Sequence, residues 1–265
     1  MSLVNFSYRS RVLGKENPVD VILPRPFRRD ENGDLNSLRE IPSGGFPVLY
    51  LLHGLSDDQS AWTRKSSIER YVASHELAVV MPNVDQSFYT DMACGQDYWT
   101  YLTNELTEVC HRYFPLSSRR ADNFVAGLSM GGYGAFKWAL RKPDKFAAAA
   151  SLSGSLDIAG TIAGLEGEEK EKLEWIFGDL EDVEGSNNDL IALARDLANS
   201  RTKAPKLFQC CGTDDFLYES NLRFKDAARE LSLELTYKEE GGTGHEWDYW
   251  DRMIGEVLGW LPLDR

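Results

Sequence analysis

A serine stands between two glycines in Gly127-Leu128-Ser129-Met130-Gly131, a segment that fits the pattern G-x-S-x-G. It follows a short apolar run, Asn123–Ala126, and precedes a helical pattern over Gly131–Leu140. In this strand–turn–helix setting, a tight turn presents the serine hydroxyl at the edge of a sheet, and the helix N-terminus points free N–H groups at developing negative charge. The spacing therefore predicts that Ser129 is an enzymatic nucleophile.

The same glycines could instead belong to an ordinary strand-to-helix turn or to a phosphate-binding loop. However, Gly127, Gly131, Gly132 and Gly134 do not fit the dinucleotide-binding pattern G-x-G-x-x-G, and the chain holds no G-x-x-x-x-G-K-[ST] segment. The nucleophile is the favoured interpretation of this turn.

A serine hydroxyl is a weak nucleophile at neutral pH and needs a base within hydrogen-bond reach. After a nucleophile on a strand–turn–helix elbow, the acid comes next in the chain and the histidine last. His245 is the only histidine that follows Ser129, and it lies in a glycine-rich loop just before the last helical pattern. We therefore expect His245 to be the base, rather than a helix cap or a solvent-exposed side chain.

Two adjacent carboxylates, Asp214 and Asp215, follow the apolar run Lys206–Cys211. One of them would accept the imidazole Nδ1–H, fix the tautomer and stabilise the imidazolium, and the other would cap the following turn. Both cannot face one imidazole without like-charge repulsion. Spacing alone leaves the choice between them open.

Acyl transfer at a serine also needs backbone N–H groups that stabilise the oxyanion. One is expected from Met130, the residue after the nucleophile, and the other from the loop after an early strand. An apolar run ends in His53-Gly54-Leu55, so we assign the second N–H to Leu55 and the turn to Gly54. His53 has an alternative role as a second base, but we expect it to pack under this loop and hold it.

Short apolar runs alternate with helical patterns through most of the chain. This alternation predicts an α/β fold, with a mostly parallel central sheet and helices on both faces. The expected strands are Pro47–Leu52, Leu77–Met81, Asn123–Ala126, Phe146–Leu152, Lys206–Cys211 and Leu233–Lys238. The expected helices open at the capping-box spacing of Ser66–Glu69, run through Tyr98–Val109 and Gly131–Leu140, and end with Ser220–Leu231 and Glu246–Trp260.

Two regions depart from this alternation. Near the N-terminus, Val4–Leu13 and Pro18–Leu23 predict antiparallel strands, and Arg25–Glu40 predicts a polar loop. At about 155–204, two helical stretches predict a short lid-like insertion over the C-terminal edge of the sheet; they are Gly167–Phe177 and Asp189–Asn199. We expect residues 1–265 to form a single domain that includes this insertion.

The chain carries 29 Lys and Arg against 42 Asp and Glu, a formal net charge of −13. A field of this sign argues against binding to nucleic acid and against docking on anionic membranes. No stretch approaches 18 consecutive apolar residues, so no transmembrane helix is expected. The first residues show no basic region followed by an apolar run, and we therefore expect a cytoplasmic protein without a secretory signal.

The four cysteines, Cys94, Cys110, Cys210 and Cys211, include no C-x-x-C pair and match no zinc-site spacing. The four histidines include no H-x-H or H-x-x-x-H pair. We expect no metal site, and free thiols in a reducing compartment.

With these parts in place, the chain resembles the esterase D branch of the α/β-hydrolases, most closely its tributyrin esterase and acetylesterase members. The similarity covers nearly the whole chain from about residue 4. The segments that carry it are Pro47–Ser56, Val80–Asn83, Phe88–Asp91, Phe124–Phe136, Leu152–Gly154, Cys211–Tyr218 and Gly244–Trp247.

The resemblance implies an α/β-hydrolase fold and a short-chain acyl ester hydrolase that needs no cofactor and is often homo-oligomeric. It also implies that the acid is the aspartate directly before the Phe-Leu-Tyr run, which is Asp215. Relatives that hydrolyse S-formylglutathione usually carry a cysteine soon after His-Gly-Leu, whereas Ser56-Asp57-Asp58 stands here, which argues against that substrate. Secreted feruloyl esterases, acetylxylan esterases and mycolyltransferases share the fold.

Three functions compete on this basis. The first is a serine carboxylesterase for short-chain acyl esters, with a small-molecule ester as its partner. The second uses the same triad as an S-formylglutathione hydrolase-like thioesterase or as an acyltransferase, and the third is a non-catalytic binding protein. A closed pocket would favour short acyl groups. Trp175, Ile176 and Phe177 of the insertion are expected to close it, and Phe88, Tyr89 and Trp99, which could equally be core, to form another wall.

Overall fold

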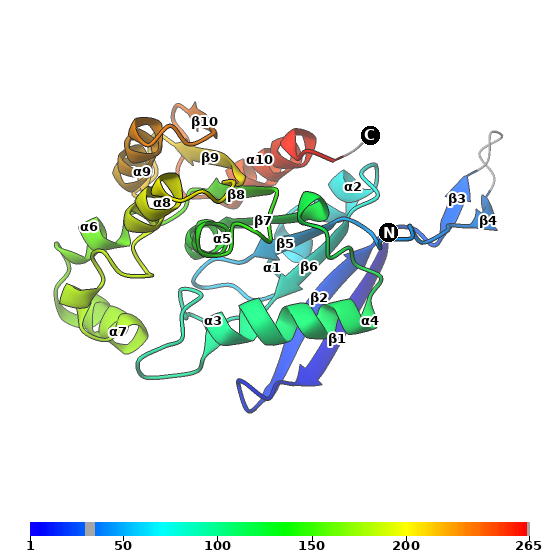
Figure 1. The fold of residues 1–265 in the computed structure, drawn as a ribbon, viewed down its shortest axis with the longest axis horizontal. Coiled ribbons are helices and arrows are strands. Elements are labelled where there is room, and N and C mark those ends of the chain that lie inside the picture. The colour runs from blue at the N-terminus through cyan, green and yellow to red at the C-terminus, as the bar shows by residue number, and fades with distance from the viewer. Residues whose placement is uncertain (30–34, 264–265) are drawn as a thin grey trace.

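In the computed structural model, which describes residues 1–29 and 35–263, eight strands form one sheet in the order β1-β2-β6-β5-β7-β8-β9-β10 (Figure 1). The β1–β2 and β2–β6 pairs are antiparallel, and all the other pairs in this sheet are parallel. This confirms the mostly parallel sheet with antiparallel N-terminal strands. The strands are β1 (Ser2–Arg9), β2 (Glu16–Leu23), β5 (Val48–Leu52), β6 (Ala78–Pro82), β7 (Asn123–Leu128), β8 (Ala148–Leu152), β9 (Lys206–Gly212) and β10 (Leu235–Glu240).

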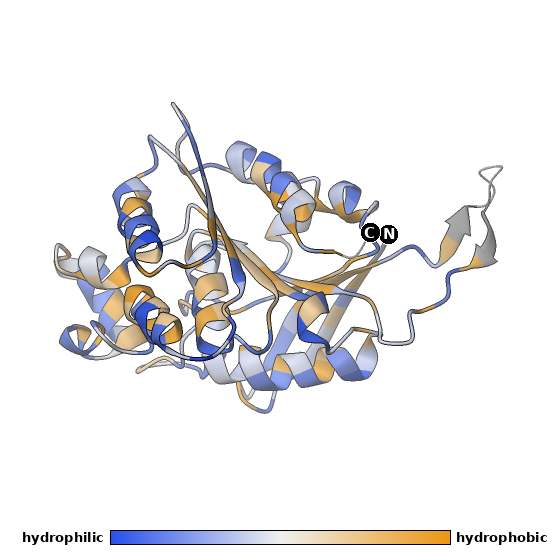
Figure 2. Ribbon diagram, turned by 45° about the horizontal axis from the view of Figure 1, so that its top comes forward, coloured by the Kyte–Doolittle hydropathy of each residue, from blue (hydrophilic) through white to orange (hydrophobic). Residues whose placement is uncertain are grey.

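Helices cover both faces of the sheet, because successive side chains of a strand point to opposite faces and both sets are apolar. Tyr50 of β5 packs in the core beneath α4, α5, α8 and α9, whereas its neighbour Leu51 packs in a second core beneath α1, α2 and α10. Figure 2 shows the hydrophobic strands enclosed between these layers. The helices are α1 (Ala61–Lys65), α2 (Ile68–Val72), α3 (Tyr98–Thr100), α4 (Thr107–Tyr113), α5 (Met130–Arg141), α6 (Ile158–Ile162), α7 (Gly167–Phe177), α8 (Leu190–Asn199), α9 (Tyr218–Glu230) and α10 (Trp247–Trp260).

Two expected helices differ from their patterns in detail. The helix over Tyr98–Val109 is present, but its middle, Tyr101–Leu106, is π-helical and joins α3 to α4. The capping-box spacing is used in part, because Ser66 Oγ accepts the N–H of Ile68, the first residue of α2, at 3.3 Å, while the N–H of Ser67 donates to Asp251 Oδ1 at 2.6 Å. A residue of α10 therefore also caps α2, which a local pattern cannot predict.

The segment Arg25–Glu40 is not the polar loop that its composition predicts. Strand β3 (Phe27–Arg29) pairs antiparallel with β4 (Leu35–Leu38), and this two-stranded sheet projects away from the main sheet (Figure 1). The expected loop also includes residues 30–34, which lie outside the described residues. Composition missed these strands because their backbones pair with each other, and Phe27 and Leu38 are exposed at 45% and 72%.

The region 155–204 holds α7 and α8 at the predicted positions, and a short helix, α6, that no pattern predicted. The end of α7 is tied to the loop before α3, because Ala93 N–H donates to Ile176 O at 3.0 Å and Cys94 N–H donates to Trp175 O at 2.8 Å. These bonds connect the inserted helices to a loop that comes much earlier in the chain.

Candidate active site

Ser129 lies in the turn between β7 and α5, and its backbone is strained. Its φ of 53° and ψ of −120° place an L-residue in a region that side chains rarely adopt. Backbone hydrogen bonds hold it there: Ser129 N–H donates to Leu152 O of β8 at 2.9 Å, and Ser129 O accepts from Tyr133 N–H at 3.1 Å and from Ser155 N–H at 3.4 Å. The turn therefore has the strained geometry of a nucleophile elbow.

The two glycines of the elbow are required by close packing. A Cβ on Gly127 would lie 2.4 Å from the carbonyl of Gly131, and a Cβ on Gly131 would lie 2.4 Å from Leu52 O of β5. Both distances are far below van der Waals contact. Only glycine at these positions lets α5 start this close to the sheet.

His245 lies in the loop between β10 and α10, and its two ring nitrogens face two different partners. Nε2 lies 2.9 Å from Ser129 Oγ, and Nδ1 lies 2.8 Å from Asp215 Oδ2. Because the carboxylate can only accept, Nδ1 carries the proton and Nε2 accepts from the serine hydroxyl. The structure therefore brings Ser129, His245 and Asp215 into one chain of hydrogen bonds.

The two aspartates after β9 differ sharply in their surroundings. Asp215 is buried, and its second oxygen accepts the N–H of Leu217 at 2.8 Å, whereas Asp214 is exposed and contacts the hydroxyl of Thr213. Burial alone would raise the pKa of Asp215, but its hydrogen bonds from His245, Leu217 and Ser153 outweigh burial and hold this pKa below its ordinary value. Asp215 therefore stays ionised beside the imidazole.

Ser153, at the end of β8, is a buried contact of this site that the sequence analysis did not single out. Its backbone is left-handed (φ 47°), its hydroxyl accepts from Trp250 Nε1 at 3.1 Å, and that hydroxyl is one of the polar groups that lower the pKa of Asp215. Strand order brings it to the site, because Leu152-Ser153-Gly154 ends the strand next to β7 and so lies at the edge that carries Ser129.

Two aromatic rings fix the plane of His245. The ring of Phe216 lies 4.6 Å from the imidazole, and Trp250 meets it edge-on at 4.7 Å. Phe216 is 77% exposed, so its ring covers the solvent side of the imidazole while Trp250 supports it from the interior.

The backbone around Ser129 offers the two N–H groups expected of an oxyanion hole. Met130 is the first residue of α5, so its N–H has no acceptor within the helix. The loop that carries Leu55 lies against the serine, because a Cβ on Gly54 would be 3.7 Å from Ser129 Cβ. Both candidate groups therefore belong to segments that adjoin the nucleophile.

Both ring nitrogens of His53 form hydrogen bonds with backbone groups beneath this loop. Val84 N–H donates to Nε2 at 3.1 Å, so Nδ1 carries the proton and donates to Gly54 O at 2.8 Å. Burial lowers the pKa of His53 and keeps the ring neutral, although its bond to Gly54 opposes this effect. The alternative role as a second base is therefore wrong, and the ring holds the loop.

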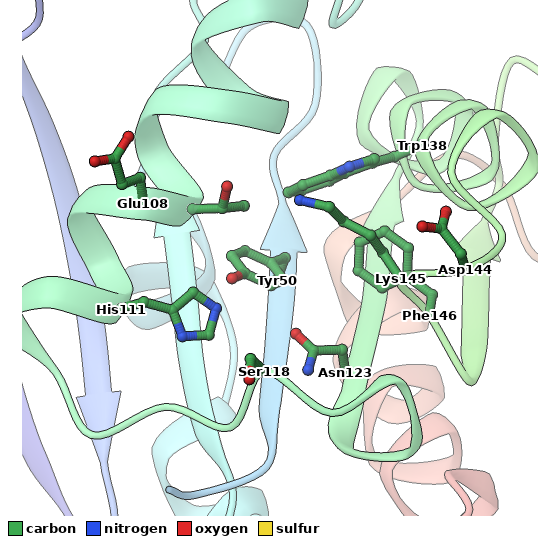
Figure 3. Close-up of a pocket in the computed structure, with 10 residues that line it drawn as sticks. Tyr50, Glu108, His111, Ser118, Asn123, Trp138, Asp144, Lys145 and Phe146 are labelled. Atoms are coloured by element: carbon green, nitrogen blue, oxygen red, sulfur yellow. The ribbon is translucent and has the colours of Figure 1, made fainter. Parts of the chain in front are cut away.

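Two hollows lie at different ends of the sheet. A cleft of about 560 Å³ begins at Leu55 and continues between Asp57, Asp85, Met92 and Tyr98; we call it the Leu55 cleft. A pocket of about 410 Å³ (Figure 3) includes Asn123, the first residue of β7, and so lies about 20 Å along that strand from Ser129. The Leu55 cleft therefore adjoins the candidate site.

Among the described residues, no group of three or more His, Cys, Asp or Glu side chains is placed to hold a metal ion. No helix in residues 1–29 and 35–263 is long and apolar enough to cross a membrane.

Comparison with known proteins gives matches over the whole chain. The Esterase family model matches residues 10–261. An acetyl esterase from Caldicellulosiruptor saccharolyticus is 30% identical over 268 residues, covering 98% of each chain. Two solved structures are from Staphylococcus aureus: the substrate-bound fluorophosphonate-binding serine hydrolase F (38% identity, TM-score 0.86, 99% of each chain) and S-formylglutathione hydrolase FrmB (37% identity, TM-score 0.83, 98% of each chain).

Proposed function

Because the chain belongs to the Esterase family and is a serine carboxylic ester hydrolase of the α/β-hydrolase fold, we propose that it cleaves short-chain acyl esters through an acyl-enzyme on Ser129. The observation that carries the assignment of Ser129 is the hydrogen-bond chain from its hydroxyl through His245 to Asp215, on a strained strand–turn–helix elbow.

In the first half of the reaction, Ser129 Oγ attacks the ester carbonyl while His245 Nε2 takes the hydroxyl proton. The carbonyl oxygen becomes an oxyanion that accepts the N–H groups of Leu55 and Met130. Asp215 stabilises the imidazolium, which then protonates the alcohol as the ester C–O bond breaks.

In the second half, water attacks the acyl group on Ser129 while His245 again takes a proton. The new oxyanion is held by the same two N–H groups. Its collapse releases the carboxylic acid and returns the proton to Ser129 Oγ. Asp215 keeps its charge throughout, and no cofactor enters any step.

Replacing Ser129 by alanine tests this proposal directly. Ser129→Ala should lower kcat by about 10⁶-fold, as loss of the triad nucleophile does in subtilisin. It should also abolish covalent labelling by a fluorophosphonate probe while thermal unfolding stays unchanged. Ser7→Ala on the outer strand β1 is the matched control and should keep full activity. Activity of Ser129→Ala within tenfold of the parent would contradict the assignment.

The preference for short acyl groups is supported by aromatic packing close to the nucleophile. Tyr133, one helical turn after Ser129, meets Phe88 at 5.7 Å and Phe177 of α7 at 6.5 Å between ring centroids. We propose that α7 closes the acyl pocket as a lid through this cluster. Of the other expected wall residues, Trp175 is 62% exposed, whereas Ile176, Tyr89 and Trp99 are core.

A series of p-nitrophenyl esters from acetate to palmitate tests this preference. In a closed pocket each methylene first contributes about 0.8 kcal/mol of burial. Beyond the end of the pocket, overpacking costs about 1–3 kcal/mol. The plot of kcat/KM against acyl length should therefore peak at acetyl to butyryl and then fall. A value still rising past octanoate would show an open pocket.

A thioesterase acting on S-formylglutathione is the second candidate, and the similarity to FrmB favours it. Glutathione is anionic, whereas Asp57 and Asp85 line the Leu55 cleft and the chain carries a net charge of −13. We therefore expect kcat/KM for acetyl esters to exceed that for S-formylglutathione, and the opposite order would favour the thioesterase.

Adding an alcohol acceptor and analysing the products separates hydrolysis from acyl transfer.

Location and assembly are parts of the same proposal. Cys110, Cys210 and Cys211 are buried free thiols, as in proteins of a reducing compartment, which supports a cytoplasmic location. The projecting β3–β4 pair exposes Phe27 and Leu38, which supports assembly into a homo-oligomer. Light scattering on the purified protein tests the second point.

A further inference from the structure

Tyr89, in the loop after β6, is fully buried and held in a strained conformation. Its φ is 52°, the preceding Phe88 has a φ of 48°, and its N–H donates to Ser87 Oγ at 3.1 Å. Two successive non-glycine residues in the left-handed region are costly and persist only where the surroundings hold them. The contacts of Tyr89 must therefore be strong enough to keep this loop in place.

The ring of Tyr89 lies directly on α5. A Cβ on Gly134 would be 2.4 Å from Tyr89 Cδ2, so glycine at this position makes room for the ring. Because α5 begins at the nucleophile, this contact fixes Tyr89 relative to Ser129.

Lys137, one turn further along α5, holds the backbone of the same loop. Its Nζ is fully buried and donates to Tyr89 O at 3.1 Å and to Thr90 Oγ1 at 2.5 Å, and it lies 5.4 Å from the ring centres of Tyr133 and Trp99. Burying an ammonium group is expensive unless its hydrogen bonds are made. A methionine would fill the same space without the desolvation cost of an ammonium group. The lysine is therefore better explained by its hydrogen bonds to the loop of Tyr89 and Thr90.

The hydroxyl of Tyr89 then reaches the loop that carries Leu55. Tyr89 Oη donates to His53 O at 2.9 Å, and the ring of His53 donates to Gly54 O at 2.8 Å. The carbonyl of Gly54 and the N–H of Leu55 belong to one planar trans peptide and point in opposite directions. Fixing these two successive carbonyls therefore fixes the direction of the Leu55 N–H.

We propose that Tyr89, held by Lys137, is a positioning residue that aims the Leu55 N–H at the oxyanion. This inference rests on the proposed function, since it needs Leu55 to be an oxyanion donor. Tyr89 touches no reacting atom and acts through the peptide units of His53 and Gly54.

Tyr89→Phe removes only the hydroxyl and is the decisive variant. The Leu55 N–H would remain but point less directly at the oxyanion. The value of kcat should therefore fall by about tenfold to a hundredfold, less than on removing an oxyanion donor outright. KM should stay within about twofold, because the oxyanion exists only in the transition state. Affinity for an alkylboronic acid, whose tetrahedral adduct occupies the same hole, should fall by the same factor as kcat.

Tyr50→Phe is the matched control. Tyr50 is also buried, and its hydroxyl has no hydrogen-bond partner among the described residues. This variant should keep the parental kcat and boronate affinity. A Tyr89→Phe enzyme with parental values of both would overturn the inference, as would an equal loss in the Tyr50→Phe control.

Lys137→Met tests the second half of the inference. It should lower kcat in the same way, and the double variant with Tyr89→Phe should lose less than the product of the two single losses, because both act on one loop. If the loss of kcat in the double variant equals the product of the two single losses, Lys137 does not act through Tyr89. If Lys137→Met does not fold, Tyr89→Phe still decides the role of Tyr89.

An active Ser129→Ala would overturn the proposed function, whereas an inactive Ser129→Ala with a parental Tyr89→Phe would overturn this inference alone.

Discussion

At the scale of single residues, the site depends on which side chains are buried rather than on which types are present. Asp214 and Asp215 are adjacent and identical in type, yet only Asp215 is enclosed and meets Nδ1 of His245. The turn after β9 decides this, because Asp215 N–H donates to Gly212 O and the chain then folds back into α9. The two aspartates therefore form a natural matched pair.

Replacing each aspartate by asparagine separates them. Asp215→Asn should lower kcat by about 10⁴-fold, because an amide favours the wrong imidazole tautomer, as the same change does in the triad of the serine proteases. Asp214→Asn should change kcat less than about twofold. Steady-state kinetics on p-nitrophenyl acetate measures both, and the reverse pattern would move the acid to Asp214.

A second pair of variants tests the hydroxyl of Ser153. Ser153→Ala removes one of the bonds that keep Asp215 ionised, so the pKa of Asp215 should rise and kcat should fall by about tenfold. The loss should grow as the pH is lowered, which a pH–rate profile records. Ser151→Ala is the control, because Ser151 is equally buried but its hydroxyl has no partner among the described residues. Equal effects of the two variants would rule out a specific role for Ser153.

The sequence was sufficient to predict that Ser129 and His245 meet in one site, since a strand–turn–helix pattern and a single downstream histidine are local features. It could not choose between Asp214 and Asp215 without the family resemblance, because the choice depends on how one turn packs against α9. Ser153 was missed for a related reason. Its role arises from strand order, which places β8 between β7 and β9, and no spacing along the chain encodes that order.

At the scale of elements, the start of α5 is the most tightly packed part of the site. The helix starts directly after Ser129, and Gly131 lies against Leu52 and His53 of the neighbouring segment. This closeness is what brings the first N–H groups of the helix to the position where negative charge develops.

Adding one methyl group at Gly131 should push the start of α5 away from the end of β5. A Cβ there would lie 2.4 Å from Leu52 O, so Gly131→Ala should cost about 1–3 kcal/mol of stability through overpacking. It should also lower kcat, because Met130 and Leu55 would move apart. Gly255→Ala in α10 is the control: its Cβ would meet Tyr71 at 3.8 Å, and the change should stabilise the helix by about 0.5–1 kcal/mol. Urea unfolding measures both, and an unaffected Gly131→Ala would show that α5 has room to shift.

Predictability differed between elements for physical reasons. The central strands and the long helices were predicted closely, because each buries an apolar face that leaves a regular pattern. The β3–β4 pair and the π-helical turn at Tyr101–Leu106 leave none. The first pairs through its backbone and leaves Phe27 and Leu38 exposed, and the second changes the hydrogen-bond register between α3 and α4.

At the scale of the whole molecule, buried titratable groups set the response of stability to pH. Burial lowers the pKa of His53, so the unfolded chain binds a proton at a pH where the folded chain does not. Below about pH 6.5, the ordinary value of histidine, protonation therefore favours the unfolded state. Asp215 acts in a separate window, because its lowered pKa adds stability that is lost only below about pH 4.

Unfolding by urea between pH 7.5 and pH 5 tests this response. The free energy of unfolding should fall as the pH drops through 6.5, with a contribution from His53 of at most about 1.4 kcal/mol per pH unit. His53→Gln, which has no titrating ring, should show a shallower slope even if it is less stable at pH 7.5. An identical slope in the two proteins would mean that His53 titrates normally in the folded state.

The strand order described above also has a consequence for how activity appears during refolding. Ser129 and His245 are 116 residues apart in the chain, and Asp215 and His245 follow β9 and β10, the last strands at one edge of the sheet. Parallel neighbours join only after long crossovers, so their pairing is slow compared with helix formation. Ester hydrolysis requires all of these loops at once, so on refolding it should return after the helical circular-dichroism signal. The recovery of ester hydrolysis therefore measures the docking of the edge strands, since a chain with its helices formed but its edge strands undocked has no turnover.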